Sequence, residues 1–384
     1  MLKYLGIRDL GLRMPEYWFK YGVTEVSLEV PEEISQRKIE VKEVEIAEGI
    51  WRELRSFAHE VGRDAGAGRV AILYDHVDED LSLSILRHVI DSLLDDGREV
   101  TLLISYWRLP PKVGADHARE CLRRHGIPVK AIEARESEKI SFNGLTVSKE
   151  FLEASARIVI TTSELHGLLG KASFEEALAL GGLFQAEFDS DPREFIKEVC
   201  ERFSSEAPFQ VITQLNGRVY YGEADNVGRE VSRALEHSTI SVDDAEMIIA
   251  GGGGYPRDST FQSILHLFGL LRESVVEGGL IGVVAECKEG LGSGELLEAL
   301  LRGGGRGLEA EAIKLVKDVM ENRRIALTST LPKAILKDLL NIRGFDVPQE
   351  LLTYGVRLYG KDMKLLVLER PVIKPVRGQI SGQS

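Results

Sequence analysis

Residues 69–105 read RVAILYDHVDEDLSLSILRHVIDSLLDDGREVTLLIS, and this stretch decides the fold class. It begins with an apolar run, residues 69–74, that is short enough for a buried strand. A helix is predicted next, because apolar side chains recur every three or four residues from Leu83 to Leu94. A glycine that can end this helix precedes a second apolar run, residues 100–105. The strand–helix–strand order predicts parallel strands joined by a right-handed crossover.

The alternation of short apolar runs and amphipathic helices extends over most of the chain. Another buried strand is predicted at residues 157–162, and Asn-Gly pairs at 143–144 and 216–217 predict two tight hairpins. A polar stretch, residues 237–244, then resembles a passage between domains. Beyond it the alternation restarts, with strands predicted at residues 246–250, 280–285, 324–328 and 364–368.

These patterns predict an α/β protein that consists of two α/β domains with a ligand cleft between them. We expect an N-terminal domain over residues 1–240, a C-terminal domain over residues 241–374, and a flexible polar tail over residues 375–384. The length of 384 residues is typical of about two domains. Ligands of such sheets bind beyond the carboxyl ends of the strands, so the loops there are the candidate site.

Composition and charge exclude several classes of function. The net charge is −13, which argues against a nucleic-acid partner. No apolar run approaches the roughly 18 residues of a membrane span, and the first residues do not resemble a secretory signal. The three cysteines are far apart in the sequence, so neither a disulfide scaffold nor a thiolate zinc site is indicated. We therefore expect a cytoplasmic protein without a membrane partner.

Four consecutive glycines, residues 251–254, follow a predicted strand and precede a long predicted helix. Glycines at this place let the backbone approach a ligand closely, and the start of the helix favours an anion. The alternative is a tight turn between strand and helix. The dinucleotide-binding pattern GxGxxG fails, because its third glycine would fall on Pro256 or Arg257. This failure argues against a nicotinamide-dependent dehydrogenase.

Cysteine and histidine side chains supply further candidates after the predicted strands. Cys287 is either a nucleophile or a small buried residue, and the second interpretation is favoured because no histidine is near it in sequence. His76 and His166 each follow a buried strand, where a neutral imidazole can act as a base, although a single histidine is more often structural. No HxH or HxxxH pair is present, so spacing assigns no metal ligand.

The second half of the sequence resembles the C-terminal domain of the lactate racemase family. Residues 252–263 read GGGYPRDSTFQS, where members of that family typically carry GGxPxDxNxYQSxK. The distance from Asp258 to Gln262 is one residue shorter than in that pattern. A Gly-Gly pair precedes the strand predicted at residues 280–285, and residues 286–292, ECKEGLG, resemble the family's EC-x-G-x-G loop.

The first half resembles the same family more loosely. Asp75 and His76 stand where the family has its DHTR turn. Residues 106–110, YWRLP, fall where it has GTHRP, and residues 164–170, ELHGLLG, fall where it has PHxxxGxxGGxK. The order of the motifs along the chain is that of the family.

The resemblance implies a two-domain enzyme that racemises or epimerises 2-hydroxy acids with a nickel pincer nucleotide tethered to a lysine. Such chemistry needs a base for the hydroxyl proton, cations for the carboxylate and a cleft that closes. The resemblance implies catalytic roles for His166, Asp75 and Arg108. It also implies that a larger set contacts the cofactor or ligand: Gly251, Gly252, Gly253, Gly254, Tyr255, Pro256, Gln262 and Glu286.

The sequence departs from the family pattern where the cofactor would be held. Glu176 stands at the position of the tethering lysine, and a carboxylate cannot form the same linkage. Trp107 replaces a histidine, Leu265 replaces a lysine and Asp78 replaces an arginine. No counterpart of the nickel-ligating histidine is evident near residues 188–192, so the metal ligands stay unassigned. We expect weak or absent retention of the nucleotide.

Two hypotheses of function follow. The first is a racemase-type or epimerase-type isomerase acting on a 2-hydroxy acid or related small acid, with an altered active site. The alternative is a non-catalytic protein that binds a small-molecule carboxylate or a nucleotide on the same scaffold. In both, side chains that follow separate strands converge in one pocket. The residues expected there are Asp75, Arg108, His166, Gly253, Tyr255 and Gln262.

Overall fold

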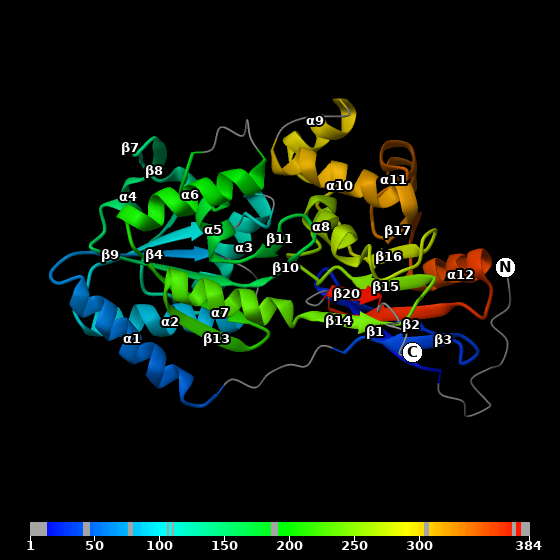
Figure 1. Ribbon diagram of the computed structural model, residues 1–384, viewed down its shortest axis with the longest axis horizontal. Helices are drawn as coiled ribbons and strands as arrows, with labels where there is room; N and C mark the ends of the chain where they lie inside the picture. Colours follow the sequence, from blue (N-terminus) through cyan, green and yellow to red (C-terminus); the bar gives the residue numbers. More distant parts are fainter. Residues whose placement is uncertain are drawn as a thin grey trace, which may run out of the picture.

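Two six-stranded sheets, each packed against helices, form the body of the protein (Figure 1). In the computed structural model, the N-terminal lobe contains the first sheet and the C-terminal lobe the second. The α/β class predicted from the sequence is confirmed. The described residues are 14–40, 47–75, 80–105, 107–109, 111–185, 191–302, 307–370 and 374–377.

The first sheet has the strand order β13-β12-β9-β4-β5-β6, and β13 alone among these strands runs antiparallel to its neighbour. The predicted hairpin at Asn216 joins β12 to β13, and Asn216 takes the positive φ that such a turn requires. The strands are β4 (Val70–Asp75), β5 (Val100–Ser105), β6 (Ala131–Glu133), β9 (Ala156–Thr162), β12 (Gln210–Leu215) and β13 (Arg218–Glu223).

Helices cover both faces of the first sheet because alternate residues of each strand point to opposite sides. In β4, Ile72 and Tyr74 face one core, while Ala71 and Leu73 face the other. The first core is covered by α1 (Ile50–Asp64), α2 (Asp80–Asp95) and α3 (Pro111–Arg124). The second core contains α4 (Lys149–Leu152), α5 (Phe174–Leu180), α6 (Pro192–Glu206) and α7 (Ala224–Glu236).

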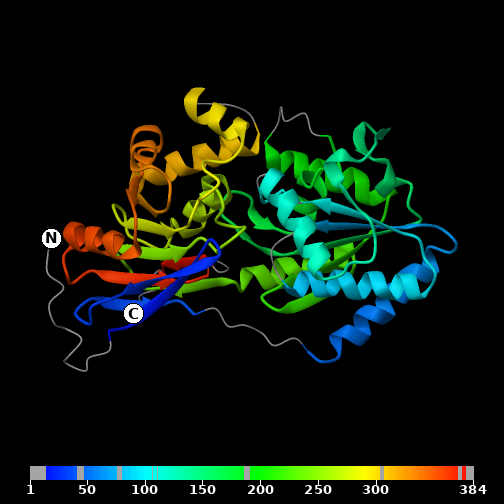
Figure 2. The same ribbon diagram turned by 180° about the vertical axis from the view of Figure 1, so that it is seen from behind.

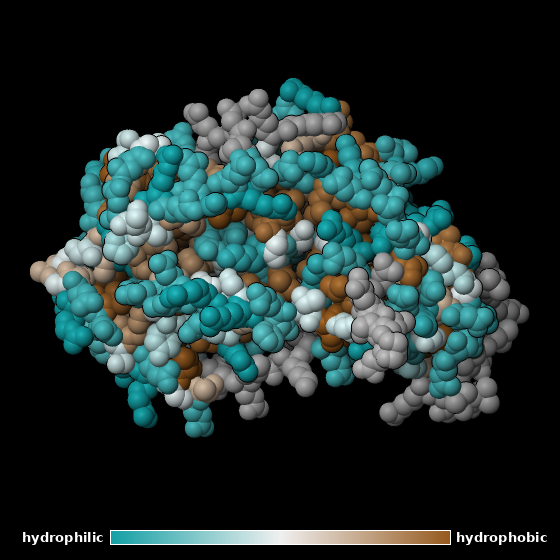
Figure 3. All heavy atoms as spheres, in the orientation of Figure 1, coloured by the Kyte–Doolittle hydropathy of each residue, from teal (hydrophilic) through white to brown (hydrophobic). Residues whose placement is uncertain are grey.

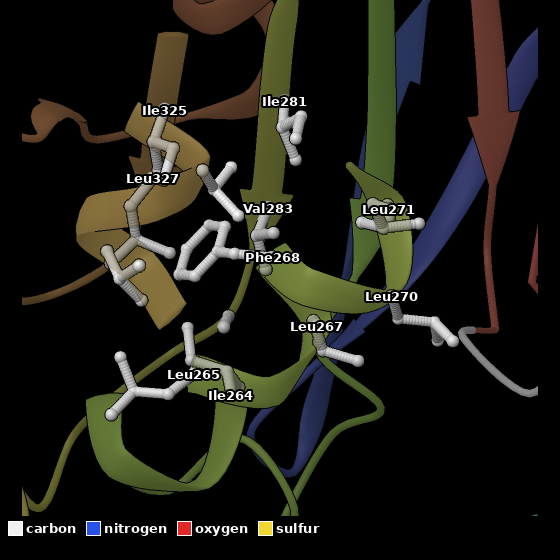
Figure 4. Close-up of a cluster of buried hydrophobic side chains, with 14 of the residues drawn as sticks. Ile264, Leu265, Leu267, Phe268, Leu270, Leu271, Ile281, Val283, Ile325 and Leu327 are labelled. Atoms are coloured by element: carbon white, nitrogen blue, oxygen red, sulfur yellow. The ribbon is translucent and has the colours of Figure 1, made fainter. Parts of the chain in front are cut away.

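The second sheet is parallel throughout, in the order β18-β17-β16-β15-β19-β3. Side chains of α8, among them Phe268, pack on one face against Ile281, Val283 and Leu327 (Figure 4). The strands are β15 (Met247–Gly251), β16 (Leu280–Val284), β17 (Arg324–Thr328), β18 (Arg343–Phe345) and β19 (Lys364–Leu368). The helices are α8 (Phe261–Leu271), α9 (Gly294–Arg302), α10 (Leu308–Asn322), α11 (Lys333–Leu340) and α12 (Pro348–Tyr359).

The N-terminal strands belong to the second lobe, which corrects the expected boundary of a domain over residues 1–240. Strand β3 (Ser35–Lys38) pairs in parallel with β19 at the edge of the second sheet. The hairpin of β1 (Glu16–Tyr21) and β2 (Thr24–Glu29) packs on the same lobe, as Figure 2 shows. No local pattern predicts this pairing, because β3 is a short polar strand whose partner is more than 300 residues away.

The polar passage and the tail also form strands. Within residues 237–244, β14 (Thr239–Val242) pairs in parallel with β20 (Lys374–Arg377). The expected flexible tail therefore needs correction at residues 375–377, whose backbone is held by β14. Short antiparallel pairs complete the described fold: β7 (Lys139–Phe142) with β8 (Leu145–Ser148), and β10 (Glu164–His166) with β11 (Gly170–Ala172).

The surface agrees with the composition. Hydrophilic side chains cover most of the face in Figure 3. Within the described part of the chain, no helix combines the length and apolarity that a membrane crossing requires.

Candidate functional site

A cavity of about 70 Å³ lies between the two lobes. The N-terminal lobe lines it with residues that follow β5 and β9, and the C-terminal lobe lines it with side chains of α8 and α10. The lining residues are Trp107, Arg108, Leu109, Glu164, His166, Leu168, Gln262, Ser263, Leu265, His266, Leu308, Glu309 and Ala312.

The strand order brings the charged residues of the first lobe together. Strand β4 lies between β5 and β9, and all three are parallel, so their carboxyl ends meet at one edge. Asp75 ends β4, Arg108 follows β5, and Glu164 lies two residues after the end of β9. This is the edge at which parallel sheets bind ligands.

Arg108 is the centre of this polar network, and only 9% of its side chain is exposed. One terminal nitrogen donates to the Thr162 carbonyl at 2.7 Å and lies 3.2 Å from the Asp75 carboxylate. The other donates to Glu164 at 3.1 Å. The guanidinium is therefore shared between two carboxylates of its own lobe.

Asp75 is fully buried behind Arg108 and does not line the cavity itself. Thr161 donates a hydrogen bond to it at 2.9 Å and Ser105 donates another at 3.2 Å. Burial raises the pKa of Asp75, and the Arg108 charge acts in the opposite direction. Its place beneath the arginine makes Asp75 a positioning group for Arg108.

Glu164 joins the two lobes through Arg257, which comes from the loop before α8. The Arg257 guanidinium donates to Glu164 at 2.7 Å, on the opposite carboxylate oxygen from Arg108. Burial alone would raise the pKa of Glu164, but Arg257 and Arg108 together hold that pKa well below its ordinary value. Glu164 is therefore ionised at neutral pH and ties the lobes together beside the cavity.

Two stacked histidines, one from each lobe, form the wall next to this network. The rings of His166 and His266 lie 4.4 Å apart at their centroids, with 9° between their planes. Gly167 allows this approach, since a Cβ there would lie only 1.9 Å from the His266 carbonyl oxygen. Burial is the main reason why both pKa values are lowered. The pKa of His266 is lowered to about 4, and that of His166 lies well below its usual range. Both rings are therefore neutral at pH 7.

The hydrogen bonding of His166 limits what it can do chemically. The Leu169 backbone N–H donates to Nδ1 of His166 at 3.2 Å. A neutral imidazole has one acceptor nitrogen and one donor nitrogen, so this contact leaves the proton on Nε2. In this arrangement His166 offers a ligand a hydrogen-bond donor, and its lone pair is not free to act as a base.

Gln262 lines the cavity, as predicted, but both ends of its amide have partners. Its oxygen accepts from the Ser293 N–H at 2.6 Å, and its nitrogen donates to Glu309 at 3.2 Å. It therefore connects α8 to the segment before α9 and to the start of α10.

Known proteins resemble this one in structure and not detectably in sequence. No family model and no curated protein matches the sequence. Among solved structures, the lactate racemase apoprotein from Thermoanaerobacterium thermosaccharolyticum matches with a TM-score of 0.70. The match covers 95% of this chain and 100% of that one, at 14% sequence identity. The fold is lactate racemase-like. An identity this low establishes the fold alone, and function has to be argued from the site.

The glycine loop of this lactate racemase-like fold lies against the N-terminal hairpin and does not line the described cavity. A Cβ on Gly254 would meet Lys20 at 2.8 Å, and a Cβ on Gly251 would meet the Glu369 carbonyl oxygen at 2.4 Å. The Tyr255 N–H donates to the Gly22 carbonyl at 2.8 Å. The close approach predicted for these glycines therefore exists, with the chain's own backbone as the partner.

Asp258 and Glu286 lie at the same hairpin. The buried Asp258 carboxylate accepts from the N–H groups of Gly22 at 2.9 Å and Glu286 at 3.1 Å. The Glu286 side chain occupies the space beside Gly22, where a Cβ would be 1.8 Å from its oxygen. Of the residues predicted to converge, Arg108, His166 and Gln262 line the cavity, and the residues from Gly251 to Pro256, with Glu286, are placed elsewhere.

Position 176 has a structural role. Glu176 accepts from the backbone N–H of Ser173 at 2.8 Å and from its hydroxyl at 2.9 Å, in a capping box that begins α5. Its side chain is buried, and burial raises its pKa. The nearest lysine in sequence, Lys171, pairs with Glu175.

The residues present do not fit a tethered nickel pincer nucleotide. Glu176, which stands where the resemblance would place the tethering lysine, is a carboxylate that caps a helix. The cavity of about 70 Å³ has room for on the order of five water molecules. Among the described residues, no group of three His, Cys, Asp or Glu side chains could hold a metal ion. His76, Asp78 and residues 186–190 lie outside the described residues.

Sequence reasoning missed four residues of this site: Glu164, Arg257, His266 and Glu309. The helical pattern around His266 is typical of a structural residue, yet His266 stands four residues after Gln262, on the same helix face. That spacing was the available signal. Glu309 is far from every motif of the resemblance, so only the tertiary structure brings it to the cavity.

Proposed function

We propose that this protein binds a small polar molecule in the interdomain cavity and does so without a tethered nucleotide. The observation that carries the proposal is the cavity itself, which is lined by both lobes and contains buried charges beside two neutral imidazoles. Sites of this kind combine an apolar wall with a few placed polar groups. Leu168, Leu265 and Ala312 supply the wall here.

The proposal separates binding from the racemase chemistry that the fold suggests. Glu176, at the position that the resemblance assigns to the tethering lysine, caps a helix. The acceptor nitrogen of His166 already receives a hydrogen bond from the Leu169 N–H. Binding needs neither of these groups. The Glu164–Arg257 ion pair would hold the lobes around a bound molecule.

A thermal-unfolding screen with small polar metabolites tests this function. We expect ligands of roughly five to ten heavy atoms to raise the unfolding temperature of the wild type, because binding to the folded state alone stabilises it. Ala312→Met, which fills the cavity, should abolish that rise. Glu321→Met, at an exposed position of the same helix α10, should retain it. A screen in which no compound distinguishes the wild type from Ala312→Met would contradict the proposal.

Intact-mass and metal analysis test the absence of the tethered group. Protein made together with the enzymes that build the pincer nucleotide should have the mass of the bare polypeptide. A covalent nucleotide adduct with stoichiometric nickel would contradict this expectation.

The second candidate is a racemase or epimerase acting on a 2-hydroxy acid. It is favoured by the structural match to the lactate racemase apoprotein, together with the presence of both His166 and Arg108 at the cavity. Incubation of the purified protein with each enantiomer of lactate, followed by chiral chromatography, tests it. Under the leading proposal we expect no racemisation.

A further inference from the structure

The charges around the cavity do not balance. Arg108 and Arg257 carry two positive charges, while Asp75, Glu164 and Glu309 carry three carboxyl groups. The histidines add no charge at neutral pH, because burial keeps them unprotonated. Within the part of the chain that the structure describes, the carboxyl group without an ion-pair partner is that of Glu309, on the C-terminal lobe.

Arg108 is poorly placed to receive a carboxylate from a ligand. Its two terminal nitrogens already contact Asp75, Glu164 and the Thr162 carbonyl. Its Nε is buried and has no partner among the described residues. An incoming carboxylate would have to displace two carboxylates of the protein.

Glu309 is in the opposite situation. It lines the cavity from the first turn of α10, and its Oε1 accepts from the Gln262 amide at 3.2 Å. No lysine or arginine among the described residues forms an ion pair with it. Burial raises the pKa of Glu309, the nearby Glu295 adds to this effect, and the hydrogen bond from Gln262 acts in the opposite direction.

A second polar atom at the cavity also has no partner. Nδ1 of His266 is buried and makes no hydrogen bond within the described part of the chain. Buried polar atoms are ordinarily hydrogen-bonded, so an unsatisfied one at a cavity calls for a partner that enters from outside. Opposite it, His166 offers its Nε2 proton to an oxygen.

We propose that the ligand of this cavity carries a protonated amino group, which pairs with Glu309, and a neighbouring hydroxyl, which contacts the histidine pair. A short amino alcohol has this chemistry, with one strong donor group and no carboxylate. The inference rests on the proposed function, since it names the ligand class of the same cavity.

Three probes with one three-carbon skeleton test the inference: 1-amino-2-propanol, propane-1,2-diol and lactate. They differ at one terminal carbon. It bears an ammonium group in the first compound and a neutral hydroxyl in the second, and it is the carboxylate carbon in lactate. Isothermal titration calorimetry at pH 7 and constant ionic strength gives Kd for each. We expect the amine to bind at least about tenfold more tightly than the diol, since a charged hydrogen bond is worth that much, and lactate to bind most weakly.

Matched variants locate the effect. Glu309→Gln keeps the size of the side chain and should remove the preference for the amine over the diol. Glu311→Gln, on the same helix and paired with Lys314 towards solvent, should keep it. Circular dichroism would verify that both variants are folded.

The outcomes separate this inference from the function on which it rests. Binding of lactate or the diol in preference to the amine would overturn the inference and leave small-molecule binding intact. A preference for the amine that survives in Glu309→Gln would also overturn it. Binding of none of the three probes, together with a negative metabolite screen, would contradict both.

Discussion

The loops at the ends of the two sheets differ in what they contact. In the first lobe, the loops after β5 and β9 end in charged side chains that reach the interdomain cavity. In the second lobe, the glycine-rich loop after β15 packs against the β1–β2 hairpin through Gly254, and Arg257 of the same loop pairs with Glu164 beside the cavity. Both loops occupy the edge at which parallel sheets bind ligands.

A glycine-rich loop therefore predicts that its backbone closely approaches another group, but it does not identify that group. Gly254 lies against Lys20 of the chain's own N-terminal hairpin, so its lack of a side chain is explained without a ligand. The C-terminal lobe contributes to the cavity through α8 and α10 instead. Substitutions in the two regions should therefore differ in their effects on stability.

The ion network of the first lobe should give the largest effect. Glu164→Gln leaves Arg257 and Arg108 without the charge that compensates them, and we expect the free energy of unfolding to fall by about 3–4 kcal/mol. Urea titration would measure it. Glu198→Gln, which breaks an exposed pair with Arg202, is the control and should change stability far less. Equal effects of the two variants would contradict the structural role of Glu164.

The glycine loop should respond as a packed backbone contact. Gly254→Ala should cost about 2–3 kcal/mol, because the new Cβ would lie 2.8 Å from Lys20 and φ is +77°. Gly278 has a similar φ of +74°, but its Cβ would meet nothing within 4 Å. Gly278→Ala should therefore cost only the backbone strain, about 1 kcal/mol. Similar losses of unfolding free energy in both variants would contradict this prediction, because contact with the hairpin would then contribute nothing.

The histidine pair should make stability fall in mild acid. The pKa of His266 is lowered to about 4, whereas an unfolded histidine has a pKa near 6.5, so the unfolded state binds the proton first. This contribution is complete above pH 6.5 and is lost as the pH falls towards 4. Between pH 7 and 5 we expect a loss of about 1–2 kcal/mol.

His266→Phe keeps a ring against His166 and removes this titration, so the pH dependence should become shallower. Thermal unfolding at several pH values measures it, with the exposed His237→Phe as the control. An unchanged slope in His266→Phe would show that His266 is already protonated in the folded protein or does not titrate in this range.

Substitutions at position 176 should have the smallest effect on stability. They test whether Glu176 serves the local helix structure. Glu176→Ala removes the capping box and should cost about 1 kcal/mol. Glu176→Gln can form the same box and should be nearly neutral. A gain of stability in Glu176→Ala would argue that the buried carboxylate is kept for a function and not for the helix.

The sequence predicted the elements whose signals are local. The apolar runs at β4, β5, β9, β17 and β19, and the Asn-Gly hairpins, appear in the structure at the expected residues. Arg108 and His166 were placed at the site because each closely follows a strand whose neighbours are parallel to it. Gln262 was placed there through its motif.

The rest depended on pairs of segments far apart in the chain. The polar strand β3 carries no apolar run and is defined only by its pairing with β19. Glu309 reaches the cavity because α10 packs beside α8. The stacking of His166 on His266 depends on the close contact of Gly167 with the backbone of α8.

Local sequence patterns therefore predicted the α/β class and most strands, since periodicity is a property of the chain. Residue identity alone also shows a glutamate at position 176, where the resemblance would place a lysine. Only the tertiary structure decided which surfaces meet. It covered the glycine loop with the N-terminal hairpin and assembled a cavity from two lobes. Among the described residues it also placed no lysine or arginine in an ion pair with Glu309, whose pKa burial raises, because the environment of a buried group depends on its neighbours in space.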